Sequence, residues 1–253
     1  MKNFKIDFID PLFAVAIHIG IVEGLMTEPW LAEHEHRSFP TTLPEYANLL
    51  LFVAGIWTIV ASWVGYHVSI QKREIKGEAR FVLDIVLLGL YIFLLLYFRS
   101  PLAMALLLAS IYAVYIAWDY FKTVEYAGEF YGPISLPERE PLVPNGLTYL
   151  WRCVAEWISP SADRRLISSA VTVGWAAFFL VIVPFTTWPA ATTNYGKIAF
   201  AVVLMLANHF YRSDKQNMGK VICSGTVKLL IIVAALTALV ASFGQLATLV
   251  CSA

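Results

Sequence analysis

The sequence predicts an all-α membrane protein, a polytopic helix bundle with about seven transmembrane helices. Two observations support this prediction. First, 59% of the 253 residues are hydrophobic, only 14% are charged, and the mean hydropathy is +0.68, whereas a soluble domain is usually about one quarter charged. Second, seven segments contain the roughly 20 mostly apolar residues that a helix needs to cross a bilayer. No polar stretch is long enough to form a separate soluble domain.

The seven segments differ in strength. The sixth is the weakest, because Asn194 and Lys197 shorten its apolar part. Only Arg99 and Ser100 separate the third from the fourth, which predicts a tight helical hairpin with Pro101 at the start of its second helix. The expected spans are residues 8–27, 46–70, 80–98, 101–121, 165–188, 194–211 and 226–250.

Lysine and arginine are distributed unevenly between the two ends of these spans. With the N-terminus in the cytoplasm, only Arg37, Arg99 and Lys197 of the 18 basic residues lie on the outer side. Cytoplasmic loops of membrane proteins carry such an excess of positive charge. The sequence therefore predicts a cytoplasmic N-terminus, and this bias suits a bacterial inner membrane, which is the localisation that we expect.

The spans divide the chain into three parts. Residues 1–121 form an N-terminal unit of four spans, residues 122–164 a cytoplasmic loop, and residues 165–253 a C-terminal unit of three spans. Within the loop, four prolines in residues 133–144 exclude a helix. Leucines and tryptophans in residues 147–158 recur at helical spacing, which predicts a short helix in the membrane interface. A cytoplasmic protein partner would dock on this loop.

The residues indicate no catalytic, metal or cofactor site. Cys153, Cys223 and Cys251 are far apart, which argues against a disulfide framework or a zinc site. The sequence lacks a nucleophile elbow, a zinc-protease motif and a glycine-rich phosphate loop, so we expect neither an enzyme nor a cofactor. The outer residues 33–36, Glu-His-Glu-His, lack further ligands in sequence and are interpreted as a solvated loop. Zero net charge gives no indication of nucleic acid binding.

Ionisable residues inside a span are costly and therefore mark candidate functional positions. In the first span, His18 lies near mid-depth and Glu23 about one turn from the outer end. They are five residues apart, so they point to different faces and each needs a partner on another helix or water. We interpret both as candidates for an ion-linked or gating role. The alternative is a His18 that bonds between helices and a Glu23 that reaches water.

A second group of polar residues shares one depth, near the cytoplasmic ends of the spans. Such residues can form a network in which paired charges lower the cost of burial. Alternatively, each of them simply meets the interface at the end of its helix. A proton-coupled transporter would depend on Asp84 or Asp119, although no substrate signature accompanies them. The group comprises Asp10, His67, Arg80, Asp84, Asp119, Asn208 and His209.

The start of the first span resembles a known channel family. Residues 8–17 have the sequence Phe-Ile-Asp-Pro-Leu-Phe-Ala-Val-Ala-Ile. This resembles the F-S-D-x-x-F-A-I-A-I signature of the first helix in the transmembrane protein 175 family, which comprises endolysosomal potassium channels and their bacterial relatives. Residues 63–67, which end the second span, are similar to the Trp-to-His ending of the family's second helix. The hairpin of the third and fourth spans also fits this family.

The resemblance implies a homo-oligomer, a tetramer as in the bacterial members, whose first helix lines a potassium-conducting pore. Four residues share one face of this span by helical spacing and would line the pore. The two isoleucines among them would form an apolar constriction that gates by dewetting. Alternatively this face packs on another helix, with Gly20 and Gly24 nearby allowing close approach. The four residues are Asp10, Ala14, Ile17 and Ile21.

Three functional hypotheses follow from these observations. The leading one is a cation-conducting, homo-oligomeric channel or channel-like pore lined by the first span. The second is a non-conducting sensor or effector subunit that docks a cytoplasmic partner through residues 122–164, in signalling or defence. The third is a small-solute transporter or membrane enzyme that uses the inner polar group. All three share the lipid bilayer as a partner, because water cannot solvate this composition.

Overall fold

Long helices make up nearly all of the chain that the structure describes. The computed structural model describes residues 4–28, 40, 42–72, 75, 77–125 and 164–217, and no residue in these ranges forms a strand. The predicted all-α class is therefore confirmed for this part of the chain. The outer Glu-His-Glu-His loop, the proline-rich stretch, the interfacial helix and the seventh span all lie outside the described residues.

The first helix changes its winding toward its end. α1 (Phe4–Ile19) continues into a π-helical turn, η1 (Gly20–Gly24), and a 3-10 turn, η2 (Leu25–Thr27). The remaining helices are α3 (Leu43–Lys72), α4 (Glu78–Leu96), α5 (Pro101–Glu125), α8 (Arg164–Thr186), the short α9 (Pro189–Thr192) and α10 (Asn194–Asn217). The α4–α5 connection confirms the predicted tight hairpin and the predicted start at Pro101.

Four helices are long and apolar enough to cross a membrane. They correspond to the first four predicted spans, and they indicate an integral membrane protein. Among the described residues, α8 contributes a shorter apolar helix, Val171–Thr186, and α10 is 24 residues long but less apolar than these four helices. The four helices are Ile9–Thr27, Leu43–Ser69, Glu78–Leu96 and Pro101–Glu125.

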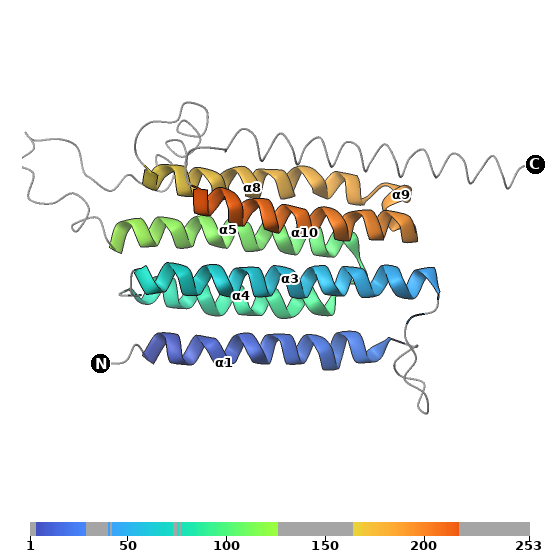
Figure 1. Cartoon of the computed structure of the whole chain (residues 1–253), viewed down its shortest axis with the longest axis horizontal. Helices are drawn as coiled ribbons and strands as arrows, with labels where there is room; N and C mark the ends of the chain where they lie inside the picture. The colour runs from blue at the N-terminus through green and yellow to red at the C-terminus, as the bar shows by residue number, and fades with distance from the viewer. Residues whose placement is uncertain are drawn as a thin grey trace, which may run out of the picture.

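The long helices lie side by side with their axes along one direction (Figure 1). Successive long helices alternate in direction, so α3, α5 and α10 run one way while α1, α4 and α8 run the other (Figure 1). α10 packs along α3, α5 lies between α4 and α8, and α1 packs mainly on α4. The described helices of the N-terminal and C-terminal parts therefore share one bundle.

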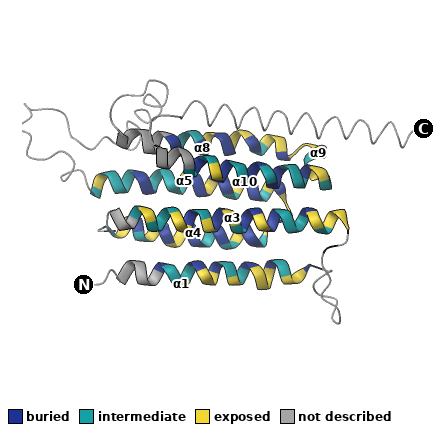
Figure 2. Cartoon of the chain, in the orientation of Figure 1, coloured by how far each residue is buried: buried dark blue, intermediate teal, exposed yellow. Residues whose placement is uncertain are grey.

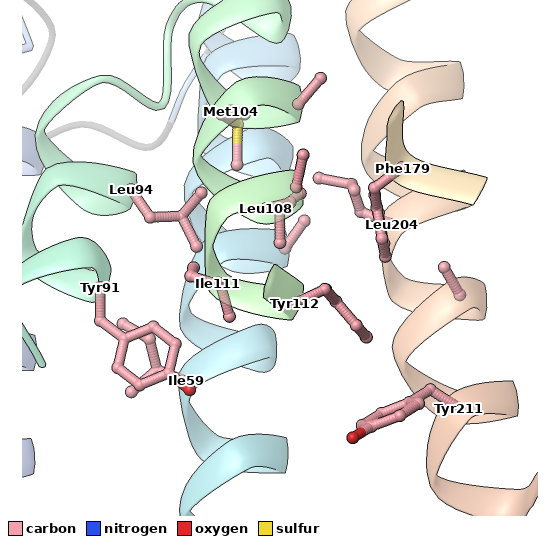
Figure 3. Packing of buried hydrophobic residues seen from close by; sticks show 14 of the residues in the cluster. Ile59, Tyr91, Leu94, Met104, Leu108, Ile111, Tyr112, Phe179, Leu204 and Tyr211 are labelled. Atoms are coloured by element: carbon pink, nitrogen blue, oxygen red, sulfur yellow. The ribbon is translucent and has the colours of Figure 1, made fainter. Parts of the chain in front are cut away.

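Apolar side chains fill the centre of this bundle and also cover its outside. Leu94, Leu108, Phe179 and Leu204 are buried where α4, α5, α8 and α10 meet (Figure 3). Large apolar residues such as Leu180, which is 61% exposed, lie on the outer faces (Figure 2). An apolar exterior on helices of this length is what lipid, rather than water, would solvate.

Two glycines let the end of α1 approach α4 closely. Gly20 and Gly24 are buried, and both face Leu95 near the end of α4. A Cβ at Gly24 would lie 2.8 Å from the Leu95 carbonyl oxygen, and one at Gly20 would lie 2.6 Å from the Leu95 Cβ. Small residues at such a contact allow backbones to approach in a membrane. The glycine face of the first span therefore packs inside the protomer.

Replacing Gly20 with alanine is expected to lower the free energy of unfolding by about 1–3 kcal/mol, the usual cost of overfilling a packed site. Gly89 is the matched control, because a Cβ there would meet nothing within 4 Å. Gly89→Ala should be neutral or slightly stabilising, since alanine favours a helix. Thermal unfolding in detergent, followed by circular dichroism, measures both variants. Equal midpoints would contradict the close packing of α1 on α4.

Candidate functional site

A partly open cavity of about 670 Å³ lies toward the end of the bundle where α4 begins and α5 ends. It forms because α3 packs extensively along α10 but only lightly against α4. Phe13 of α1 closes one side, and the rest of the wall comes from α3, α4, α5 and α10. Aromatic residues dominate this wall. They include Tyr66, Tyr91, Tyr115, Trp118 and Tyr211.

A fully buried arginine holds the α4–α5 hairpin together beside the cavity. The side chain of Arg80 is 0% exposed, and its Nη1 lies 2.7 Å from Oε2 of Glu125. The other carboxylate oxygen of Glu125 accepts the N–H of Gly77 at 2.9 Å. The guanidinium also lies 4.2 Å from the ring centroid of Trp118. A buried charge needs such a partner, because an uncompensated one is strongly destabilising.

Asp84 faces the cavity from the next turn of α4. It is 4% exposed, and its Oδ1 accepts the indole N–H of Trp118 at 3.0 Å. The hydroxyl of Tyr66 lies close enough to interact electrostatically with this carboxylate. Within the described part of the chain, Oδ2 of Asp84 has no hydrogen-bond partner. Trp118 thus lies between Arg80 and Asp84, and both keep polar atoms without a hydrogen bond in this part of the chain: Nε and Nη2 of Arg80 and Oδ2 of Asp84.

The remaining members of the predicted inner polar group lie at the edges of this site. Asp119 lines the cavity, and its Oδ2 accepts the hydroxyl of Thr172 at 2.7 Å, which joins α5 to α8. His209 also lines the cavity and is exposed. Asp10 and His67 form a separate pair with Oδ1 and Nε2 2.7 Å apart, which joins α1 to α3.

Hydroxyl and amide groups form a polar layer deeper in the bundle. The hydroxyls of Tyr91 and Tyr115 are hydrogen-bonded to each other, and Tyr115 also donates to Ser62. Asn208 donates to Thr58 at 2.8 Å, which links α10 to α3. Such bonds hold transmembrane helices together, because lipid offers polar groups no alternative partner. The sequence indicated Asn208 but not the tyrosines.

The proposed pore face of the first span is split by the fold. Ala14 and Ile21 are exposed, whereas Asp10 and Ile17 are half-buried, Asp10 against α3. Ile17 packs on the hydrophobic core. His18 and Glu23, the candidate gating residues, are both exposed. No hydrogen bond or ion pair within the described residues engages either side chain.

A chain of polar contacts closes the opposite end of the bundle. The carboxylate of Glu28 is 3% exposed and lies 2.6 Å from Nε of Arg99, at the α4–α5 turn. Asn48 of α3 donates to the same carboxylate and accepts from Lys197 of α10 at 3.1 Å. The sequence placed Glu28 in the outer loop and gave no sign of this linkage. This chain of contacts therefore holds Arg99 and Lys197, the two basic residues at this end of the described chain.

No family model, curated protein or solved structure matches this chain. The fold and the site therefore define its class by themselves: over the described residues, an all-α protein with four helices able to cross a membrane and a largely apolar cavity, lined by a few charged side chains, toward one end. Among the residues that the structure describes, no group of three or more histidine, cysteine or acidic side chains could hold a metal ion.

Replacing Glu125 with glutamine is expected to destabilise the protein by about 3–5 kcal/mol, because Arg80 would remain buried without a charged partner. Glu78→Gln is the control, since Glu78 lies exposed on the same hairpin. The double variant Arg80→Met and Glu125→Met should recover most of the loss, because both charges are removed. Denaturant unfolding in mixed micelles, followed by tryptophan fluorescence, measures these effects. A loss no larger than that of Glu78→Gln would contradict the role of this pair.

Proposed function

We propose that the protein is a homo-oligomeric cation channel, or channel-like pore, lined by the first span. One observation supports this most directly. The surface of α1 and η1 that the bundle leaves uncovered carries His18 and Glu23 among apolar residues, and both are exposed in the single protomer. A histidine or glutamate facing hydrocarbon is costly. This face therefore requires either a second copy of the chain or a water-filled path to cover it.

The two faces of α1 differ in what they offer a neighbour. Ala16, Gly20 and Gly24 are buried and occupy the side that packs inside the protomer. The outward side presents Ala14, His18 and Ile21 at helical spacing. Four such faces around an axis would give the tetramer implied by the resemblance to the transmembrane protein 175 family. In that tetramer, Ile21 forms the apolar constriction, and Glu23 attracts cations on the outer side of it.

The proposal extends to the topology of the whole chain. We place the N-terminus in the cytoplasm of a bacterial cell and count seven crossings, with α8 and α10 as the fifth and sixth. Arg80, Lys122 and Arg212 lie toward one end of the bundle, while Arg99 and Lys197 lie toward the other. The positive-inside rule favours the former end as cytoplasmic. α10 supports a sixth crossing, because it runs beside the membrane-length α3.

Replacing Ile21 with asparagine is expected to raise cation flux several-fold, because a polar side chain stabilises water in an apolar constriction. Liposomes that hold the purified protein, with potassium and sodium gradients compared, measure this flux. Leu180→Asn is the matched control, since Leu180 is exposed on α8, across the bundle from α1 (Figure 1). If both variants conduct like the unmodified protein, the pore does not pass along this face.

Replacing Glu23 with glutamine is expected to reduce the preference for potassium over chloride, because the carboxylate that concentrates cations is lost. Reversal potentials in planar bilayers under a potassium chloride gradient measure this preference. Glu78→Gln removes an exposed carboxylate from the start of α4 and should leave the preference unchanged.

The absence of flux from a well-folded oligomer, under any gradient, would contradict the channel proposal. It would instead favour the non-conducting sensor or effector that docks a cytoplasmic partner through residues 122–164.

A further inference from the structure

Two oppositely charged side chains that line the cavity between α3, α4, α5 and α10 keep a polar atom without a hydrogen bond. One is Oδ2 of Asp84, although Arg80, which forms its ion pair with Glu125, also acts on this carboxylate electrostatically. The other is Nε of the half-buried Arg212, which has no hydrogen-bond partner among the described residues. Nor does any ion pair within those residues engage Arg212. A ligand with one positively charged and one negatively charged group would pair with both Asp84 and Arg212.

The surroundings of Arg212 leave its guanidinium facing the cavity. It lies 5.4 Å from the ring centroid of Tyr211 and directly against Gly65, where any side chain would overlap it. It also acts electrostatically on the buried Tyr115. Lys122 adds a second cation to the wall, and its Nζ donates to Ser69 at 2.7 Å. This side of the cavity is therefore suited to a phosphate group.

The part of the cavity around Asp84 is suited to an ammonium group. Asp84 supplies a negative charge, and the ring of Tyr66 lines the cavity beside it. The ring of Trp118 already has the cations of Arg80 and Lys122 at 4.2 Å and 5.2 Å from its centroid. An ammonium group can bind over the face of Tyr66 through the negative charge of that face. The indole N–H of Trp118 already orients the carboxylate.

Polarity changes along the length of the cavity. Lys122 lies toward the end of the bundle where α3 and α5 finish, level with Ser69, and Arg212 lies about one turn further in, against Gly65. About one to three turns before Ser69, the wall of the cavity includes Trp57, Val60 and Val64 of α3. These three side chains are also exposed on the outside of the bundle, so the wall continues onto the surface that faces lipid. The volume, about 670 Å³, is in the range of a small-molecule site.

We propose that this cavity binds the head group of a zwitterionic phospholipid, with its phosphate at Arg212 and Lys122 and its ammonium at Asp84. The acyl chains then leave along Trp57, Val60 and Val64. A phospholipid fits better than a free zwitterion, because the polar end of the cavity lies near the membrane surface and the apolar end near the middle. All residues of this site come from a single protomer, so the proposal holds whether or not the protein forms a pore.

The test uses the full-length protein, delipidated in detergent and titrated with phosphatidylethanolamine or phosphatidylglycerol of identical acyl chains. Native mass spectrometry measures the dissociation constants. The unmodified protein should prefer the ethanolamine lipid. Asp84→Asn should raise the dissociation constant for the ethanolamine lipid about 30-fold or more, as the loss of one buried charge partner predicts. It should also abolish the preference for that lipid. Arg212→Gln should weaken the binding of both lipids, whereas Arg212→Lys should retain part of the affinity.

Equal binding of the two lipids by the unmodified protein would overturn the proposal. So would undiminished binding by both Asp84→Asn and Arg212→Gln. Soluble glycerophosphoethanolamine serves as the head group without chains, and binding of it as tight as that of the lipid would show a free phosphate ester to be the ligand instead. Val86→Ala, on the exposed face of α4, is the control and should bind both lipids normally. If Asp84→Asn does not fold, the Arg212 variants still decide between these outcomes.

Discussion

The burial of one guanidinium sets the arrangement of the polar end of the bundle. Arg80 has no exposure, so the fold must bring a carboxylate to it, and the last turn of α5 supplies Glu125. This pair fixes the register of the α4–α5 hairpin. The register in turn places Trp118 beside both Arg80 and Asp84. The cavity wall is therefore a consequence of satisfying a charge that the chain cannot expose to lipid.

The level of a residue along the bundle was predictable from the sequence, because hydrophobic run length and distance from a turn determine it. The first four spans, the tight hairpin and the grouping of Asp84 with Asp119 at one level follow from that information. The direction in which a side chain points was harder to predict from the sequence. Glu125 and the buried Glu28 were not identified as site residues, since their partners come from other helices. Glu125 lies farther from the α4–α5 turn than Arg80 does, so distance from the turn did not indicate this pair.

The two ends of the bundle are built differently. At the end near the α4–α5 turn, Glu28, Arg99, Asn48 and Lys197 form a continuous polar linkage across α3 and α10. Toward the other end, a cavity lies between α3, α4, α5 and α10. Between the two ends, the polar layer that contains Tyr115 ties the helices together. Polar contacts between helices therefore cross one end of the bundle, while a cavity lies toward the end that we propose to be cytoplasmic.

The first helix connects the two proposed sites physically. Its outward face carries His18 and Ile21, while Phe13 on its inner face lines the cavity. The ring of Phe13 lies 6.2 Å from that of Tyr66 and 5.9 Å from that of Tyr91. A molecule in the cavity contacts the helix whose opposite face would line the pore, so its affinity depends on where that helix lies. Coupling between two sites is reciprocal. A ligand that prefers one position of α1 must therefore alter the pore, and the state of the pore must alter the affinity for that ligand by the same factor.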